Sequence, residues 1–256
     1  MTRLTPAERL LQKLGITEPG EIDLEAIAFH LGARVRYRKL EGCEARIIGC
    51  KDTAIITIGK DCSDRRKRFS LAHEIGHWTH HKGQTLVCRV EESLPQGRMS
   101  PERVANTYAA DLLMPRYLFD PVARAHPKLN FKTVSDIADI FHASRSATAI
   151  RLVEGGHSPA LLVCHGNKGR KWFARGPDVP SRWFPRDDLD ADSFAFSVLY
   201  AKQPDDPMPR KIDGDAWFDR RDAGKYVVQE QTIRTGTDEI LTLVLISDPE
   251  MLEDDR

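Results

Sequence analysis

The sequence predicts an α+β protein that begins with helices and a small antiparallel sheet, continues with a helix-turn-helix-like element and ends in a separate α/β region. Three observations support this fold class. Apolar spacing switches from helical to alternating and back to helical within the first 115 residues. Two short helical segments follow around residue 145. Beyond Gly155 and Gly156, short strand-like runs stand between loops rich in Pro and Asp.

The first 60 residues contain two helical and three strand-like segments. Residues 5–15 and 22–31 carry Leu, Ile and Ala at helical spacing. The next segments are rich in β-branched residues, alternate in polarity and are bounded by glycines, which is typical of strands. These strands are expected at residues 33–37, 45–48 and 54–58, and we expect them to form the small antiparallel sheet.

Two longer helices are expected next, at residues 63–81 and 102–114. The second has a clear start, because Ser100 suits the N-cap, Pro101 the first helical position and Glu102 the first turn. Pro115 ends it.

Residues 134–141 and 145–153 have the apolar spacing of two short helices in a helix-turn-helix. His142 stands where Gly commonly takes the left-handed turn conformation. Residues 133–154 carry two arginines against three acidic residues, a net charge of −1. Because a DNA-reading helix must neutralise phosphates, direct DNA binding is possible here but not favoured.

The last hundred residues have the pattern of a separate α/β domain, a sensor or docking unit. We therefore expect a catalytic domain at residues 1–125, the helix-turn-helix-like segment at 126–155 and this domain at 156–256. Its strands are expected at residues 160–164, 171–174, 226–228 and 240–246.

Composition excludes several classes of protein. The 256 residues hold 38 Lys and Arg against 38 Asp and Glu, which argues against bulk electrostatic binding of nucleic acid. The strongest basic run, residues 65–68, either solvates a helix face or steers an acidic partner. No apolar run approaches the roughly 20 residues of a membrane span, and the N-terminus lacks the apolar core of a signal peptide. We expect a cytoplasmic protein without a membrane partner.

The motif His-Glu-Ile-Gly-His at residues 73–77 lies on a segment predicted to be helical. Residues i and i+4 share a helix face, so His73 and His77 can reach one Zn²⁺ at about 2.0 to 2.1 Å. Glu74 projects beside the metal, where it can accept a proton from a water acidified by the metal and pass it to a leaving amine. This pattern indicates peptide hydrolysis.

A catalytic zinc needs a third protein ligand. His80 is disfavoured because a rise of about 1.5 Å per residue places it roughly 10 Å from His73 along the helix axis. Three downstream carboxylates remain, those of Glu91, Glu92 and Glu102. Glu102 is preferred because it begins a helix and is followed at i+4 by Asn106, which can hydrogen-bond a ligand histidine.

Two stretches resemble the ImmA/IrrE-type zinc metallopeptidases. They are RFSLAHEIGH at residues 68–77 and ERVANTYAADLLMP at residues 102–115. The resemblance covers residues 20–155 well and is weaker beyond. It implies a zincin-like domain in which His73, His77 and Glu102 bind Zn²⁺ and Glu74 is the catalytic base, the gluzincin arrangement.

The resemblance also implies a function. Members of this family typically cleave a helix-turn-helix repressor and so induce a mobile element or a stress response. The IrrE branch carries a C-terminal GAF-like domain, which implies a small-molecule effector there. Two rivals stay open: a DNA-binding transcription regulator with a structural zinc, and a non-cleaving, ligand-sensing scaffold that sequesters a repressor.

Overall fold

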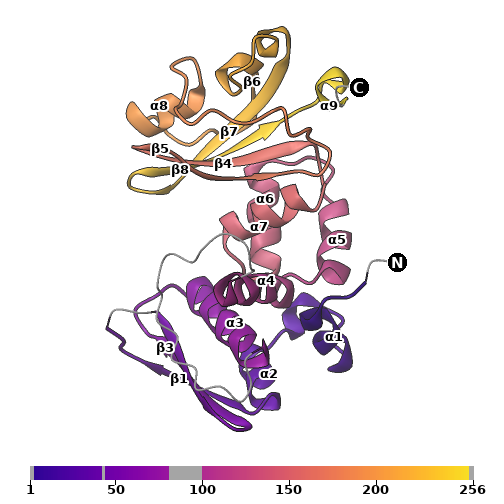
Figure 1. The fold of residues 1–256 in the computed structure, drawn as a ribbon, viewed down its shortest axis with the longest axis vertical. Coiled ribbons are helices and arrows are strands. Elements are labelled where there is room, and N and C mark those ends of the chain that lie inside the picture. Colours follow the sequence, from indigo (N-terminus) through magenta and orange to yellow (C-terminus); the bar gives the residue numbers. More distant parts are fainter. Residues whose placement is uncertain (1–2, 42–43, 81–99, 254–256) are drawn as a thin grey trace. The chain divides into compact units, whose positions relative to one another are not determined.

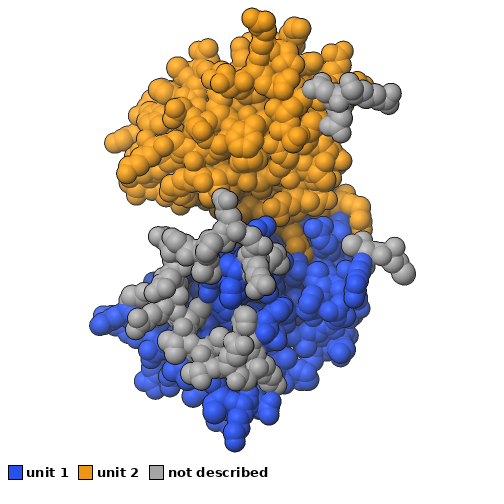
Figure 2. Space-filling model, viewed as in Figure 1, with its two compact units in different colours: residues 1–122, 138–144 blue, residues 123–137, 145–256 orange. Residues whose placement is uncertain are grey.

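The computed structural model describes residues 3–41, 44–80 and 100–253. The chain forms two compact units (Figure 2): unit 1 is residues 1–122 with 138–144, and unit 2 is residues 123–137 with 145–256. Both units combine helices with a sheet (Figure 1), which confirms the mixed α+β class. Within the described ranges, no helix has both the length and the apolar character needed to cross a bilayer.

Unit 1 opens with α1 (Pro6–Lys13) and α2 (Leu24–His30), as the apolar spacing predicts. Thr5 and Glu8 form a capping box at the start of α1. Glu8 is only 3% exposed, and its second carboxylate oxygen accepts a hydrogen bond of 2.7 Å from the backbone N–H of Arg116. This contact fixes α1 to the start of α5 (Arg116–Arg124).

The sheet of unit 1 contains β1 (Ala33–Arg38), β2 (Ala45–Cys50) and β3 (Thr53–Gly59) in the order β1-β3-β2. β2 and β3 form an antiparallel hairpin, but β1 pairs with β3 in parallel. The expected antiparallel sheet is therefore wrong for one of its two pairs. Alternating polarity marks a strand and its buried face, but it does not set the direction in which the strand pairs.

The two faces of this sheet differ sharply. Ile47 and Ile56 are fully buried on the inner face, where Trp78 packs directly on Gly49 and a Cβ at Gly49 would lie 2.5 Å from the indole ring. On the outer face Ile48 and Ile55 remain 49% and 41% exposed. The inner face therefore belongs to the core of unit 1, and it supports the helix that carries the histidine motif.

That helix is α3 (Asp64–His80), and α4 (Pro101–Leu113) follows it. The predicted start of α4 is confirmed, since the Ser100 hydroxyl accepts a hydrogen bond of 3.1 Å from the N–H of Arg103. α5 was not expected, because Pro121 lies within it and an interior proline argues against a helix.

The two predicted helices around residue 142 are present as α6 (Phe131–Ile140) and α7 (Arg145–Glu154). His142 has φ +49°, so the left-handed conformation expected at this turn position is taken by a histidine in place of glycine. The assignment of this pair as a helix-turn-helix stays a prediction.

Unit 2 is built on five strands in the order β5-β4-β8-β7-β6. All four neighbouring pairs are antiparallel, so this unit is α+β, and the expected α/β label is wrong in that respect. Its GAF-like character stays a prediction. The strands are β4 (Ala160–Gly166), β5 (Gly169–Arg175), β6 (Arg210–Asp213), β7 (Val227–Gly236) and β8 (Glu239–Leu245). The short helices of unit 2 are α8 (Phe194–Tyr200) and α9 (Pro249–Leu252). The unit also has 3-10 turns at Gly214–Ala216 and Ala223–Lys225, and unit 1 has one at Pro19–Glu21.

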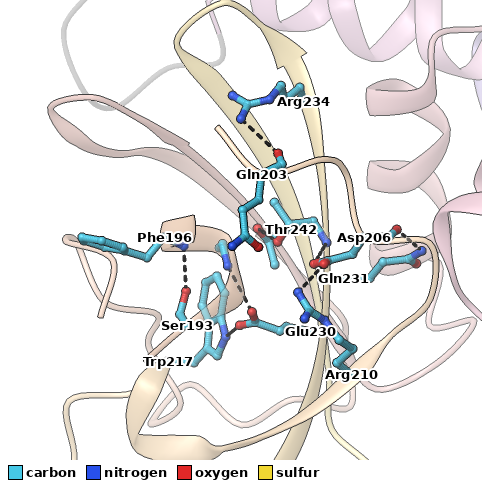
Figure 3. Close-up of polar contacts among 12 residues, drawn as sticks. Ser193, Phe196, Gln203, Asp206, Arg210, Trp217, Glu230, Gln231, Arg234 and Thr242 are labelled. Carbon is cyan, nitrogen blue, oxygen red and sulfur yellow. Dashed lines mark hydrogen bonds and ion pairs between the residues drawn. The ribbon is translucent and has the colours of Figure 1, made fainter. Parts of the chain in front are cut away.

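A buried polar cluster on β7 holds unit 2 together (Figure 3). The Glu230 carboxylate accepts hydrogen bonds from the indole N–H of Trp217 and, at 3.1 Å, from the N–H of Ala195 in the first turn of α8. Burial raises the pKa of Glu230 to about 7, although these hydrogen bonds oppose the shift. The side-chain oxygen of neighbouring Gln231 accepts a hydrogen bond of 2.8 Å from the N–H of Phe131, which fixes the start of α6 to the sheet.

Adjacent isoleucines of β3 should differ strongly in their effect on stability. Ile56→Ala removes a fully buried side chain and should lower the free energy of unfolding by about 2 to 5 kcal/mol. Ile55→Ala, its matched control, should cost less than about 1 kcal/mol because that side chain is already 41% exposed. Urea unfolding followed by circular dichroism measures both. Equal losses would contradict the assignment of inner and outer faces.

Candidate metal centre

The candidate centre is formed by α3 and α4 of unit 1. His73 and His77 are four residues apart on α3 and therefore share one face of that helix. Glu102 lies in the first turn of α4. The two helices can approach closely because position 76 is glycine: a Cβ there would lie 3.1 Å from both the Cα and the carbonyl oxygen of Ala105.

The three predicted ligands lie together. The Nε2 atoms of His73 and His77 are 3.0 Å apart. One carboxylate oxygen of Glu102 is 3.1 Å from Nε2 of His73, and the other is 3.2 Å from Nε2 of His77. Donor atoms around a tetrahedral zinc, each at about 2.0 to 2.1 Å, are roughly 3.3 Å from one another. Among the described residues, this donor set therefore fits one zinc ion held by three protein ligands.

Asn106 contacts His73, the first candidate ligand. Its side-chain oxygen lies 2.9 Å from Nδ1 of His73, the contact expected from its place one turn after Glu102. A proton on Nδ1 leaves the lone pair of Nε2 directed toward His77 and Glu102, which is the tautomer a metal needs. The side chain of His77 is only 4% exposed and that of Glu102 is 38% exposed, so the centre is open to solvent on the Glu102 side.

Glu74 lies next to these ligands in the sequence and is buried, with 2% of its surface exposed. Its Oε2 atom is inaccessible and has no hydrogen-bond partner within the part of the chain that the structure describes. Burial, followed by the negative charge of Glu102, raises the pKa of the Glu74 carboxyl to about 8. A buried carboxyl group with an unpaired oxygen beside two histidines and a second carboxylate is suited to carrying a proton.

The other polar residues near the motif do not belong to this group of three side chains, or lie outside the described residues. His80 is exposed, as expected, and its Nδ1 lies 2.9 Å from the carbonyl oxygen of Gly76. Its ring contacts Tyr108 edge-on at 5.4 Å between centroids. Tyr108 is buried in the core of unit 1, and this burial raises its pKa. His81, Glu91 and Glu92 lie outside the described residues.

The basic run at residues 65–68 is held by contacts within unit 1. Each of its side chains has a partner, so the interpretation as part of a solvated helix face is favoured over steering of another molecule. The pairs are Arg65 with Asp139, Arg66 with Glu44, Lys67 with Asp64 at 3.2 Å, and Arg68 with the carbonyl oxygen of Ile22 at 2.9 Å.

Comparison with known proteins agrees with this geometry. The model of the peptidase M78 family, described as the IrrE N-terminal-like domain, matches residues 28–153, a range that includes both metal helices. Residues 28–153 therefore form a domain of the IrrE-like family. This confirms the resemblance found in the two motifs. The IrrE-like match ends at the close of α7, so most of unit 2 lies beyond it.

A solved structure gives independent information on the fold. A Mycobacterium tuberculosis transcriptional regulator superposes with a TM-score of 0.57 at 13% sequence identity, covering 94% of this chain and 74% of the regulator. At that identity the likeness concerns the fold alone. A sequence comparison with curated proteins finds no match.

Removal of any one ligand should release zinc. His73→Ala, His77→Ala and Glu102→Ala should each weaken zinc binding more than about 100-fold. This loss exceeds the roughly 10- to 100-fold that is typical when a residue that only contacts a metal ligand is replaced. His80→Ala is the matched control and should bind zinc normally, since its ring nitrogen contacts the backbone of its own helix. Metal analysis after dialysis, with calorimetric titration, measures the effect. Loss of zinc in His80→Ala alone would overturn the ligand set.

Asn106→Leu tests the orienting contact. It should weaken zinc binding by about 10- to 100-fold, because the ring of His73 loses the acceptor that fixes its tautomer. Thr107→Leu changes the next position of α4, where the hydroxyl donates to the carbonyl oxygen of Arg103, and should leave zinc affinity within about threefold. Unchanged zinc affinity in Asn106→Leu would show that the contact with Asn106 is not needed to hold His73 in the tautomer that binds zinc.

Proposed function

We propose that this IrrE-like protein is a zinc-dependent endopeptidase of gluzincin type. The observation that carries the proposal is the convergence of His73, His77 and Glu102. Glu74, which follows His73 in the sequence, is buried and close enough to Glu102 for the charge of that carboxylate to raise its pKa. In this proposal the site has three ligands, a fourth position for water and a proton carrier, which are the parts needed for hydrolysis of an amide bond.

The residues have separate tasks in the proposed reaction. His73 and His77 hold the metal, Glu102 completes the ligand set from the second helix, and Asn106 keeps His73 in position. Bound there, Zn²⁺ would supply Lewis acidity toward a carbonyl oxygen and would acidify a water molecule. Glu74 accepts the proton of the attacking water and delivers it to the departing amide nitrogen. The positive charge of a bound Zn²⁺ would oppose the effect of Glu102 and favour the carboxylate form that Glu74 needs for the first transfer.

We further propose that the substrate is a helix-turn-helix transcriptional repressor, cleaved in response to stress or to induction of a mobile element. Family membership supports a metallopeptidase, and the fold is shared with a protein described as a transcriptional regulator. The balance of 38 basic and 38 acidic residues favours a protein over DNA as the target. Because a repressor acts on DNA, we infer a cytoplasmic location for the reaction.

Glu74→Gln separates hydrolysis from metal binding. The amide keeps the size of the side chain but cannot accept the proton, so cleavage of a co-encoded repressor should fall by at least about 100-fold while zinc content stays near one per chain. The purified full chain is incubated with the repressor, with and without chelator, and fragments are identified by mass spectrometry. His80→Ala, which lies outside the ligand set, is the active control.

The same experiment distinguishes the rival functions. Repressor that stays intact but bound to the wild-type protein would indicate a sequestering scaffold. Specific DNA binding that Glu74→Gln does not alter, without cleavage, would indicate a regulator with a structural zinc. Full cleavage by Glu74→Gln would overturn the proposed role of Glu74.

A small-molecule effector of unit 2 is part of the proposal. A cavity of about 650 Å³ opens within this unit, in the volume range of small-molecule sites. Its lining is mainly apolar and includes Leu129, Pro159, Met208, Leu245 and Leu252.

A further inference from the structure

The outer face of the unit 1 sheet concentrates positive charge. Within their bounds, β1, β2 and β3 contain four arginines and no acidic residue, in a chain whose net charge is zero. All four arginines lie on the outer face, the side opposite to buried Ile47 and Ile56. We call this surface the arginine face; it consists of Arg34, Arg36, Arg38, Arg46, Ile48 and Ile55.

Strand register places these side chains in rows. Arg34 of β1, Ile55 of β3 and Ile48 of β2 stand side by side across the sheet. The next row is Arg36, Thr57 and Arg46. Neighbouring strands are about 4.8 Å apart, and alternate residues of a strand about 6.6 Å apart. The two isoleucines therefore form an apolar patch with arginines along one side and at one end.

The arginines of this face have no acidic partner in the described ranges. Among the described residues, no carboxylate pairs with Arg34, Arg38 or Arg46, which are all exposed. Arg36 donates from Nε to the hydroxyl of Thr57 at 2.9 Å, a neutral acceptor. The run at residues 65–68, in contrast, uses its charges within unit 1. Guanidinium groups that have no carboxylate partner and are regularly spaced favour binding of an acidic ligand.

The apolar patch indicates which kind of molecule the acidic ligand is. Ile48 and Ile55 are 49% and 41% exposed at the junction of two strands, and protein interfaces typically join such a patch to arginines. Single-stranded nucleic acid would need aromatic stacking platforms, and no aromatic residue faces outward from these strands. Tyr37 points to the inner side, where its hydroxyl donates to Glu25 of α2 at 2.7 Å.

We propose that the arginine face binds an extended acidic segment of another protein. In such a segment, carboxylates at alternate positions repeat about every 6.6 to 6.8 Å, which matches the spacing of Arg34, Arg36 and Arg38 along β1. Apolar residues of the same segment would cover Ile48 and Ile55. The site lies on the opposite side of the sheet from α3, so it binds whether or not the metal centre is active.

Fluorescence anisotropy with labelled peptides tests the site on the full chain. The probes are a 12-residue peptide alternating Glu with Val and Thr, its Lys counterpart, and a 20-base-pair DNA duplex. The acidic peptide should bind at least about tenfold more tightly than either other probe, and its affinity should fall as salt is raised. Binding should persist in chelator, which distinguishes this site from the proposed hydrolysis.

Matched variants locate the binding. Arg34→Glu with Arg46→Glu should weaken binding of the acidic peptide by at least about tenfold. Lys13→Glu with Lys168→Glu makes the same charge change at exposed positions elsewhere and should stay within about twofold. If the glutamate pair does not fold, Arg34→Gln with Arg46→Gln serves, with a smaller loss in the same direction.

A second pair tests the apolar patch. Ile48→Ser with Ile55→Ser should weaken the Glu/Val/Thr peptide by about three- to tenfold and leave a Glu/Ser peptide unchanged. Equal binding by the arginine variant and its lysine control would overturn the proposal. Tight binding of the duplex through the same arginines, without binding of the acidic peptide, would overturn it in favour of nucleic acid.

Discussion

The close packing of α3 on α4 is the constraint on which the candidate metal centre depends. Two of the proposed ligands come from one helix and the third from the other, so the donor atoms meet only if the helix backbones approach within reach of a carboxylate side chain. Gly76 permits this approach, because a side chain there would meet the backbone of Ala105. The glycine inside the motif is therefore a packing residue, whereas His73, Glu74 and His77 are the residues to which we assign the chemistry. Trp78, on the sheet side of α3, anchors the same helix to Gly49.

Much of this site could be predicted from the sequence because it depends on helix spacing and on helix start signals, which involve residues close together in the chain. The relation between His73 and His77 follows from helix periodicity, and the start signals at Ser100 and Pro101 place Glu102 in a first turn. The Asn106 contact with His73 follows from the same spacing on α4. The burial of Glu74 and the contact of Gly76 with Ala105 could not be predicted, because both depend on how two helices separated in sequence pack together.

Pairing across the sheet was the least predictable part of the fold. The strand segments of unit 1 follow from their alternating polarity, but the parallel direction of β1 does not, since the same pattern serves either direction. The basic run at residues 65–68 is conspicuous in the sequence and is paired in the structure. Arg34, Arg36, Arg38 and Arg46 are inconspicuous because other residues stand between them, and only the register places them on one face.

The parallel pairing of β1 has a consequence for folding. β2 and β3 are joined by a tight turn at Lys51 and Asp52 and can form as a local hairpin, whereas β1 must close a longer loop before it pairs with β3. Three of the four arginines lie on β1, so they reach the arginine face only when β1 pairs with β3. The unfolded chain has the same charges but not their alignment. An acidic partner that needs the alignment would discriminate the completed domain from its folding intermediates.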